Sequence, residues 1–74
     1  MEQKYFKGDR VVFVFWNGEE EHSLDGTIIG IDIYRNNGLI ANIEYDIEGY
    51  YYNDKTKKCV YKHIEQKYIV NIVS

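Results

Sequence analysis

Short apolar runs alternate with polar segments along the whole chain. The runs have the length of β-strands, and the segments between them are rich in Gly, Asn, Asp and Lys. The runs cover residues 8–16, 24–34, 39–47, 50–52, 59–64 and 68–73. This pattern predicts a small, closed, all-β domain.

The first run predicts a strand over residues 10–16 with apolar side chains on both faces. Odd-numbered positions from Val11 to Phe15 share one face, and even-numbered positions from Val12 to Trp16 share the other. Such a strand is typical of a central position, or of one whose second face is covered by a loop or a partner. A polar loop is expected to follow over residues 17–23.

The next run predicts a strand over residues 24–35. Ile29, Ile31 and Ile33 lie on one face of this strand, which we assign to the core. Gly30 has no side chain to pack, and it is expected to mark a β-bulge or a sharp bend.

The segment Asn36-Asn37-Gly38 is the strongest turn signal, because Asn and Gly tolerate the positive φ of tight hairpin turns. It is predicted to join the preceding strand to another over residues 39–47. Four apolar side chains of that strand are predicted to face the core, with Asn42 and acidic residues opposite: Ala41, Ile43, Tyr45 and Ile47.

The rest of the chain predicts shorter elements. Glu48-Gly49 is expected to form a turn or a kink, and residues 50–52 a short extended segment. A polar hairpin tip is expected over residues 53–58, followed by a short strand over 59–61.

A single helical turn is predicted over residues 62–67, since this segment is too short for a stable isolated helix. The closing strand is expected over residues 68–73, with Val70 and Ile72 facing inward.

The predicted order of elements resembles the SH3-like barrel superfamily. Three motifs carry the resemblance: Gly8-Asp9-Arg10-Val11, Leu24-Asp25-Gly26-Thr27-Ile28 and Val60-Tyr61-Lys62-His63-Ile64. It covers nearly the whole chain and implies one domain over residues 1–74, a five-stranded SH3-like barrel with a single helical turn before the last strand. The chain lacks the tyrosine-rich first-loop signature of peptide-binding SH3 domains, so the resemblance implies no polyproline binding.

The length of 74 residues suits a single domain near the lower limit for folding without staples. The only cysteine is Cys59, which excludes an intrachain disulfide and a cysteine-rich zinc framework. Stability must therefore come from the apolar core or from oligomerisation. The abundance of Ile, Asn, Lys and Tyr resembles proteins encoded by AT-rich genomes, which favours a low-GC bacterium or one of its phages.

The chain shows no signal-peptide pattern and no apolar run near the roughly 20 residues that span a membrane. With a single free thiol, a cytoplasmic protein is expected.

Aromatic side chains are the leading candidates for a binding surface. Eight of the residues are Tyr, and in an extended segment neighbouring side chains face opposite ways, so at least one of residues 50–52 should be exposed. The predicted surface consists of Trp16, Tyr34, Tyr50, Tyr51 and Tyr52. Because Tyr and Trp are enriched in interface hot spots, we expect a non-catalytic module that binds a protein partner or itself. The alternative is that these tyrosines mainly build and cover the core.

Lysines near the C-terminal end suggest a second function. They are Lys55, Lys57, Lys58, Lys62 and Lys67, with Tyr61 and Tyr68 close in sequence. Basic charge combined with aromatic stacking is how single-stranded nucleic acids are held. The net charge of −3 argues mildly against non-specific binding of this kind.

A third possibility is that an acidic face mimics a nucleic-acid backbone and inhibits a DNA-handling enzyme. Its residues would be Asp32, Glu44, Asp46 and Glu48. Effective mimics usually carry more net charge than this chain.

Two further clusters carry little functional signal. The loop residues Glu19-Glu20-Glu21-His22 are adjacent and point apart, so we expect a solvated loop, or a contact for a basic partner, and no metal site. A Cys59–His63 thiol–imidazole pair would need a pocket that a small barrel fills with its own side chains. We expect no catalytic residues, no cofactor and no small-molecule substrate.

Overall fold

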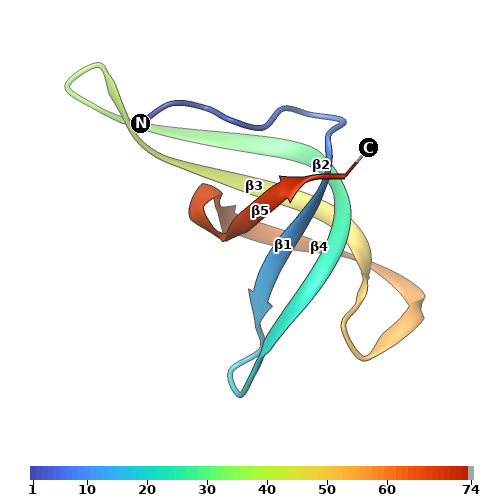
Figure 1. Ribbon diagram of the computed structural model, residues 1–74. Coiled ribbons are helices and arrows are strands. Elements are labelled where there is room, and N and C mark those ends of the chain that lie inside the picture. Colours follow the sequence, from blue (N-terminus) through green and yellow to red (C-terminus); the bar gives the residue numbers. More distant parts are fainter. Residues whose placement is uncertain (74) are drawn as a thin grey trace.

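The computed structural model describes residues 1–73 and consists of one antiparallel sheet that curls into a half-barrel (Figure 1). Its elements are β1 (Arg10–Trp16), β2 (Glu21–Asn36), β3 (Leu39–Tyr51), β4 (Asp54–Glu65), the 3-10 turn η1 (Gln66–Tyr68) and β5 (Ile69–Ile72). The strand order is β4-β3-β2-β1-β5. The predicted all-β class, with five strands and a helical turn before the last, is confirmed.

The core lies on the inner face of the curled sheet. Its buried apolar residues are Val11, Phe13, Ile28, Ile43, Tyr45, Ile47, Tyr61 and Ile69. Strand β1 has the predicted bounds, and it is central because it pairs with β2 on one edge and with β5 on the other. The polar loop after it is shorter than predicted, since β2 already begins at Glu21.

The predicted hairpin between β2 and β3 turns at Asn37 and Gly38, which both have positive φ, 54° and 79°. The inward assignment of Ile43, Tyr45 and Ile47 is confirmed, but Ala41 is exposed. Ala41 lies in the part of the β2–β3 hairpin that extends beyond β4, because β4 pairs with β3 only from Glu44 onward.

A β-bulge in β2 overturns part of the predicted core face. Ile28 pairs with Ile47 and Gly30 pairs with Asp46, so Ile29 has no partner across the strands. The extra residue reverses the side-chain alternation, so Ile28 is 1% exposed and Ile29 is 40% exposed. Ile31 packs on the core as predicted. Ile33 lies on the same face of β2 as Ile31, as predicted, but it is exposed because it lies in the part of the β2–β3 hairpin that extends beyond β4.

The expected turn at Glu48-Gly49 is wrong, because β3 continues through both residues to Tyr51. The next turn lies at Tyr52 and Asn53, so most of the predicted polar tip belongs to β4. The sequence gives no strong break inside 53–65, and pairing with β3 keeps this segment extended.

The helical turn and the last strand lie slightly later than predicted. Residues 62–65, which were expected in the helical turn, are the last part of β4, and the 3-10 turn covers Gln66–Tyr68. The inward assignment of Val70 and Ile72 is wrong, because both are exposed and Ile69 is buried instead. The register shifts between Val12 and Phe13, which leaves Val70 without a partner, and Ile72 lies on the open edge of the sheet.

Candidate functional site

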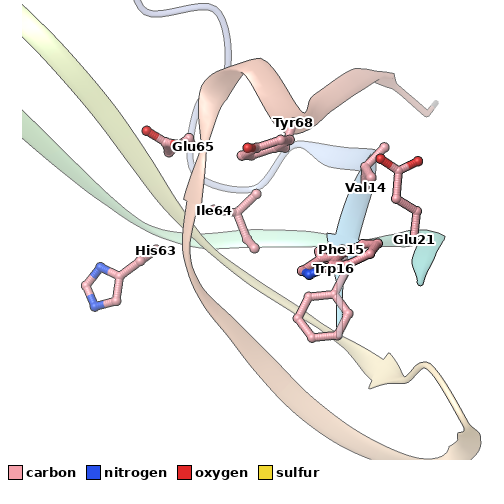
Figure 2. A pocket seen from close by; sticks show the side chains of 8 residues that line it. All are labelled: Val14, Phe15, Trp16, Glu21, His63, Ile64, Glu65 and Tyr68. Carbon is pink, nitrogen blue, oxygen red and sulfur yellow. The ribbon is translucent and has the colours of Figure 1, made fainter. Parts of the chain in front are cut away.

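A groove of about 410 Å³ opens between the end of β1 and the junction of β4 with η1 (Figure 2). Its lining residues are Val14, Phe15, Trp16, Glu21, His63, Ile64, Glu65 and Tyr68. The sequence predicted no hollow of this size, because a small closed barrel is filled by its own side chains. That expectation is wrong because β4 and β5 do not pair, which leaves this side of the half-barrel open.

The groove contains a strand edge that no other described strand covers. Strand β5 pairs with β1 only as far as Phe13, opposite Ile69, so residues 14–16 of β1 pair with β2 alone. The carbonyl of Asp9 accepts from the Ile28 N–H of β2, and the carbonyl of Arg10 accepts from the Val73 N–H on the β5 side. Because these directions alternate along a strand, the backbone groups of residues 14 and 16 point toward the groove.

The groove combines a fixed floor with exposed aromatic walls. Phe15 packs edge-on against Tyr61, with ring centroids 4.8 Å apart, and Ile64 packs on the core. Trp16 is 60% exposed and Tyr68 is 44% exposed. The floor is therefore held by the core, and two large aromatic faces remain available for contacts.

Carboxylates lie beside the aromatic walls. Glu21 and Glu65 line the groove, and Glu19 and Glu20 are exposed on the adjoining loop. Lys67 lies on the same side, with its Nζ 3.8 Å from a Glu65 carboxylate oxygen and 5.3 Å from the centre of the Tyr68 ring. The border of the groove at Glu21 is therefore acidic. At the η1 border, Lys67 partly neutralises the charge of Glu65.

The structure does not gather the five aromatic candidates into one surface. Trp16 lies in the groove, opposite Glu21 at the start of β2, and Tyr34 lies near the end of β2, opposite Asn42. About 40 Å of strand separates these two ends. Tyr52 is half-buried, and its ring centroid is 4.6 Å from that of His22 and 5.7 Å from that of Phe15.

Tyr50 and Tyr51 are exposed and lie with the lysines of early β4. Tyr51 borders a hollow with Lys57, and both tyrosines border another with Lys55. Tyr50 also borders a hollow with Lys58 and Arg10, whose guanidinium pairs with Asp25. Among the remaining predicted basic residues, Lys62 is exposed further along β4, and Lys67 lies beside the groove.

Three of the four acidic candidates lie close together on the outer face of the sheet. Asp32 pairs with Glu44, and Asp46 pairs with Gly30 on the same face. The carboxylate of Glu44, to which the Tyr34 hydroxyl donates at 3.3 Å, raises the pKa of Tyr34, with smaller contributions from burial and from the other two carboxylates. Glu48 lies apart, in a hollow with Arg10 and Lys58.

Cys59 and His63 lie in different environments. Cys59 is half-buried against the core, as expected for a structural cysteine. The His63 ring lies on the outer face, with Nδ1 3.0 Å from a Glu44 carboxylate oxygen. The other histidine, His22, has its Nε2 3.2 Å from the side-chain nitrogen of Asn17 and its ring on Tyr52.

Sequence reasoning missed the role of Tyr68 and Ile64 as groove walls. The predicted helical turn carried the relevant signal. A turn directly before the last strand brings the residues around it close to the end of the first strand, β1. The position of that turn was predicted four residues early, at 62 instead of Gln66, and Tyr68 was consequently placed inside the closing strand.

Within residues 1–73, no helix has the length and apolar character needed to cross a membrane. Comparison of the chain with models of protein families, with curated proteins and with solved structures found no match in any of the three.

Proposed function

We propose that this protein is a non-catalytic interaction module that binds an extended segment of a protein partner in the groove beside Trp16. The bound segment pairs with the uncovered edge of β1 and extends the sheet by one strand. The observation that carries the proposal is the position of this edge directly beside two exposed aromatic side chains, Trp16 and Tyr68. Strand addition supplies affinity through main-chain hydrogen bonds, and side-chain pockets supply specificity.

The chemistry of the groove favours a particular kind of segment. An aliphatic side chain suits the space between Trp16, Ile64 and Tyr68, and a Lys or Arg next to it suits the carboxylates of Glu21 and Glu65.

Selection from a random peptide library on the immobilised protein tests this proposal. We expect enrichment of peptides that combine an aliphatic residue with Lys or Arg, and a loss of more than about tenfold in affinity for Trp16→Ala and Tyr68→Ala. Tyr34→Ala is the matched control, because it removes an aromatic side chain about as exposed as that of Tyr68 at the far end of β2. A peptide whose central amides are N-methylated should bind weakly, since it cannot pair with the strand edge.

Undiminished binding by the Trp16 variant would refute the proposal. Sedimentation equilibrium of the free protein identifies a second copy as the partner if a dimer forms and Trp16→Ala abolishes it. Folding of each variant is checked by circular dichroism, so that loss of binding is not confused with loss of structure.

Binding of single-stranded nucleic acid is the second candidate function, supported by the placement of Tyr50 and Tyr51 among Lys55, Lys57 and Lys58. Fluorescence anisotropy with labelled single-stranded and double-stranded oligonucleotides tests it. Affinity should fall steeply between about 50 and 200 mM salt. Tyr51→Ala should weaken single-strand binding by about 1–3 kcal/mol. No anisotropy change at low salt would exclude this function.

A further inference from the structure

Three potential metal ligands from three adjacent strands converge on the outer face of the sheet. They are Asp32 of β2, Asp46 of β3 and His63 of β4, and their ligand atoms all lie within 4.8 Å of one another. In Figure 2 the imidazole of His63 lies apart from the other side chains of the groove. Asp32 and Asp46 are not among the residues that line the groove, but His63 is, so the cluster adjoins the proposed peptide site.

The backbone on both sides of Asp46 is irregular in a way that brings the ligands together. The bulge in β2 places Gly30 opposite Asp46, where a Cβ atom would lie 3.0 Å from the Asp46 carboxylate. A second bulge in β4, where the register with β3 shifts between Tyr45 and Ile47, leaves His63 with a positive φ of 58°. Bulges of this kind re-aim side chains.

His63 is also held in a position suited to metal binding. Its backbone N–H donates to Oδ1 of Asp46 at 3.2 Å, and its ring Nδ1 lies 3.0 Å from Oε1 of Glu44. When Nδ1–H donates to that carboxylate, Nε2 keeps its lone pair. A carboxylate on the second ring nitrogen is the usual way in which a metal-binding histidine is oriented.

The charge balance of the cluster is strongly negative. Three carboxylates share this patch, and the Lys and Arg ion pairs found in residues 1–73 involve Asp25 and Glu65, not Asp32 or Asp46. Among the ion pairs of residues 1–73, the one that involves this patch joins the imidazole of His63 to Glu44. A cation bound between Asp32 and Asp46 would offset this repulsion.

We propose that Asp32, Asp46 and His63 bind a divalent transition-metal ion of the Zn²⁺ type. Two carboxylates and one imidazole suit Zn²⁺, whereas Mg²⁺ prefers oxygen ligands alone. Ligand atoms about 2.0–2.2 Å from a Zn²⁺ ion lie closer to one another than the limit of 4.8 Å found here, so the exposed Asp32 side chain moves toward Asp46 and His63 when the ion binds. Water completes the coordination while Glu44 accepts from Nδ1–H of His63, and the ion links β2, β3 and β4.

Isothermal titration of the untagged full chain with Zn²⁺ tests this site, with thermal unfolding as a second readout. We expect one ion per chain, a rise in the unfolding temperature with Zn²⁺ concentration, and no comparable response to Mg²⁺. His63→Ala and Asp32→Asn should each lower the affinity by more than about tenfold. Both residues are exposed, so neither change removes a core contact.

The control variants are His22→Ala and Cys59→Ser, which remove the other imidazole and the only thiol. Both should bind Zn²⁺ as the unmodified protein does. An absence of binding at about millimolar Zn²⁺, or equal affinity in the His63 variant, overturns the proposal. Loss of binding in either control would overturn it as well, because the ion would then lie elsewhere.

Discussion

The hydroxyl of Tyr45 donates a hydrogen bond of 2.6 Å to Oε1 of Gln66, and both side chains are buried. The same oxygen accepts from the backbone N–H of Lys4 at 3.0 Å, and Nε2 of Gln66 donates to the carbonyl of Glu2 at 2.8 Å. One side-chain amide therefore joins β3, η1 and the N-terminal segment, and it satisfies a tyrosine hydroxyl inside the core.

Replacement of this amide should be costly. Gln66→Ala removes the main partner of the Tyr45 hydroxyl and frees the N-terminal segment, so we expect a loss of about 2–3 kcal/mol in the free energy of unfolding. Urea denaturation followed by circular dichroism measures this loss. Lys67→Ala, an exposed neighbour in η1, is the control and should change stability by less than about 0.5 kcal/mol. Equal stability of the two variants would contradict the role of Gln66.

The bulge in β2 gives a matched test of which isoleucine faces the core. Ile28→Val should cost about 0.5–1.5 kcal/mol, because it removes a methylene from a fully packed site. Ile29→Val makes the same chemical change one residue later, at an exposed position, and should be nearly neutral. Chemical denaturation of the two variants distinguishes them, and the reverse order would mean that the bulge lies elsewhere.

The close approach of β2 and β3 at Gly26 and Gly49 leaves no room for a side chain. A Cβ on Gly26 would lie 2.5 Å from the Glu48 carbonyl oxygen and 2.7 Å from the Ile47 side chain. Gly26→Ala should therefore destabilise the protein by about 1–3 kcal/mol, measured by thermal unfolding. Ser23→Ala, at an exposed position of the same strand, should leave the unfolding temperature within a few degrees of the original.

The stability of the protein should fall in alkaline solution. Burial raises the pKa of Tyr45, and burial together with the neighbouring Cys59 thiol raises the pKa of Tyr61 well above its usual range. The unfolded chain loses these protons near pH 10, whereas the folded protein retains them to higher pH. The folded state then binds more protons, so the contribution of these two tyrosines to the free energy of unfolding is constant below about pH 10 and decreases above it.

Urea denaturation at about pH 8 and about pH 11 measures this decrease. Tyr61→Phe should make the decrease smaller, although it also costs the 2.6 Å hydrogen bond to the Tyr50 carbonyl at both pH values. Tyr51→Phe replaces an exposed tyrosine and serves as the control. A decrease of the same size in the Tyr61 variant would show that this hydroxyl is not responsible.

Local signals in the sequence determined much of the architecture. The alternation in residues 10–16 and 43–47 established a strand and a core face, because a side-chain period of two is a local property of extended backbone. The Asn37-Gly38 turn followed from the need for positive φ at both positions. Gly30 marked the bulge correctly, but the sequence did not show which neighbour would be the unpaired residue.

Only the tertiary structure decided which residues of these elements are buried, which are exposed and which lie together. Whether Ile29 or Ile28 faces the core depends on the register with β3, and the exposure of Val70 depends on the register with β1. The uncovered edge beside Trp16 exists because β5 begins only at Ile69, opposite Phe13. Asp32, Asp46 and His63 are far apart in the chain and meet only because three strands pair in one register. Strand pairing is non-local, so a periodic pattern predicts that strands form but not which residues they bring together.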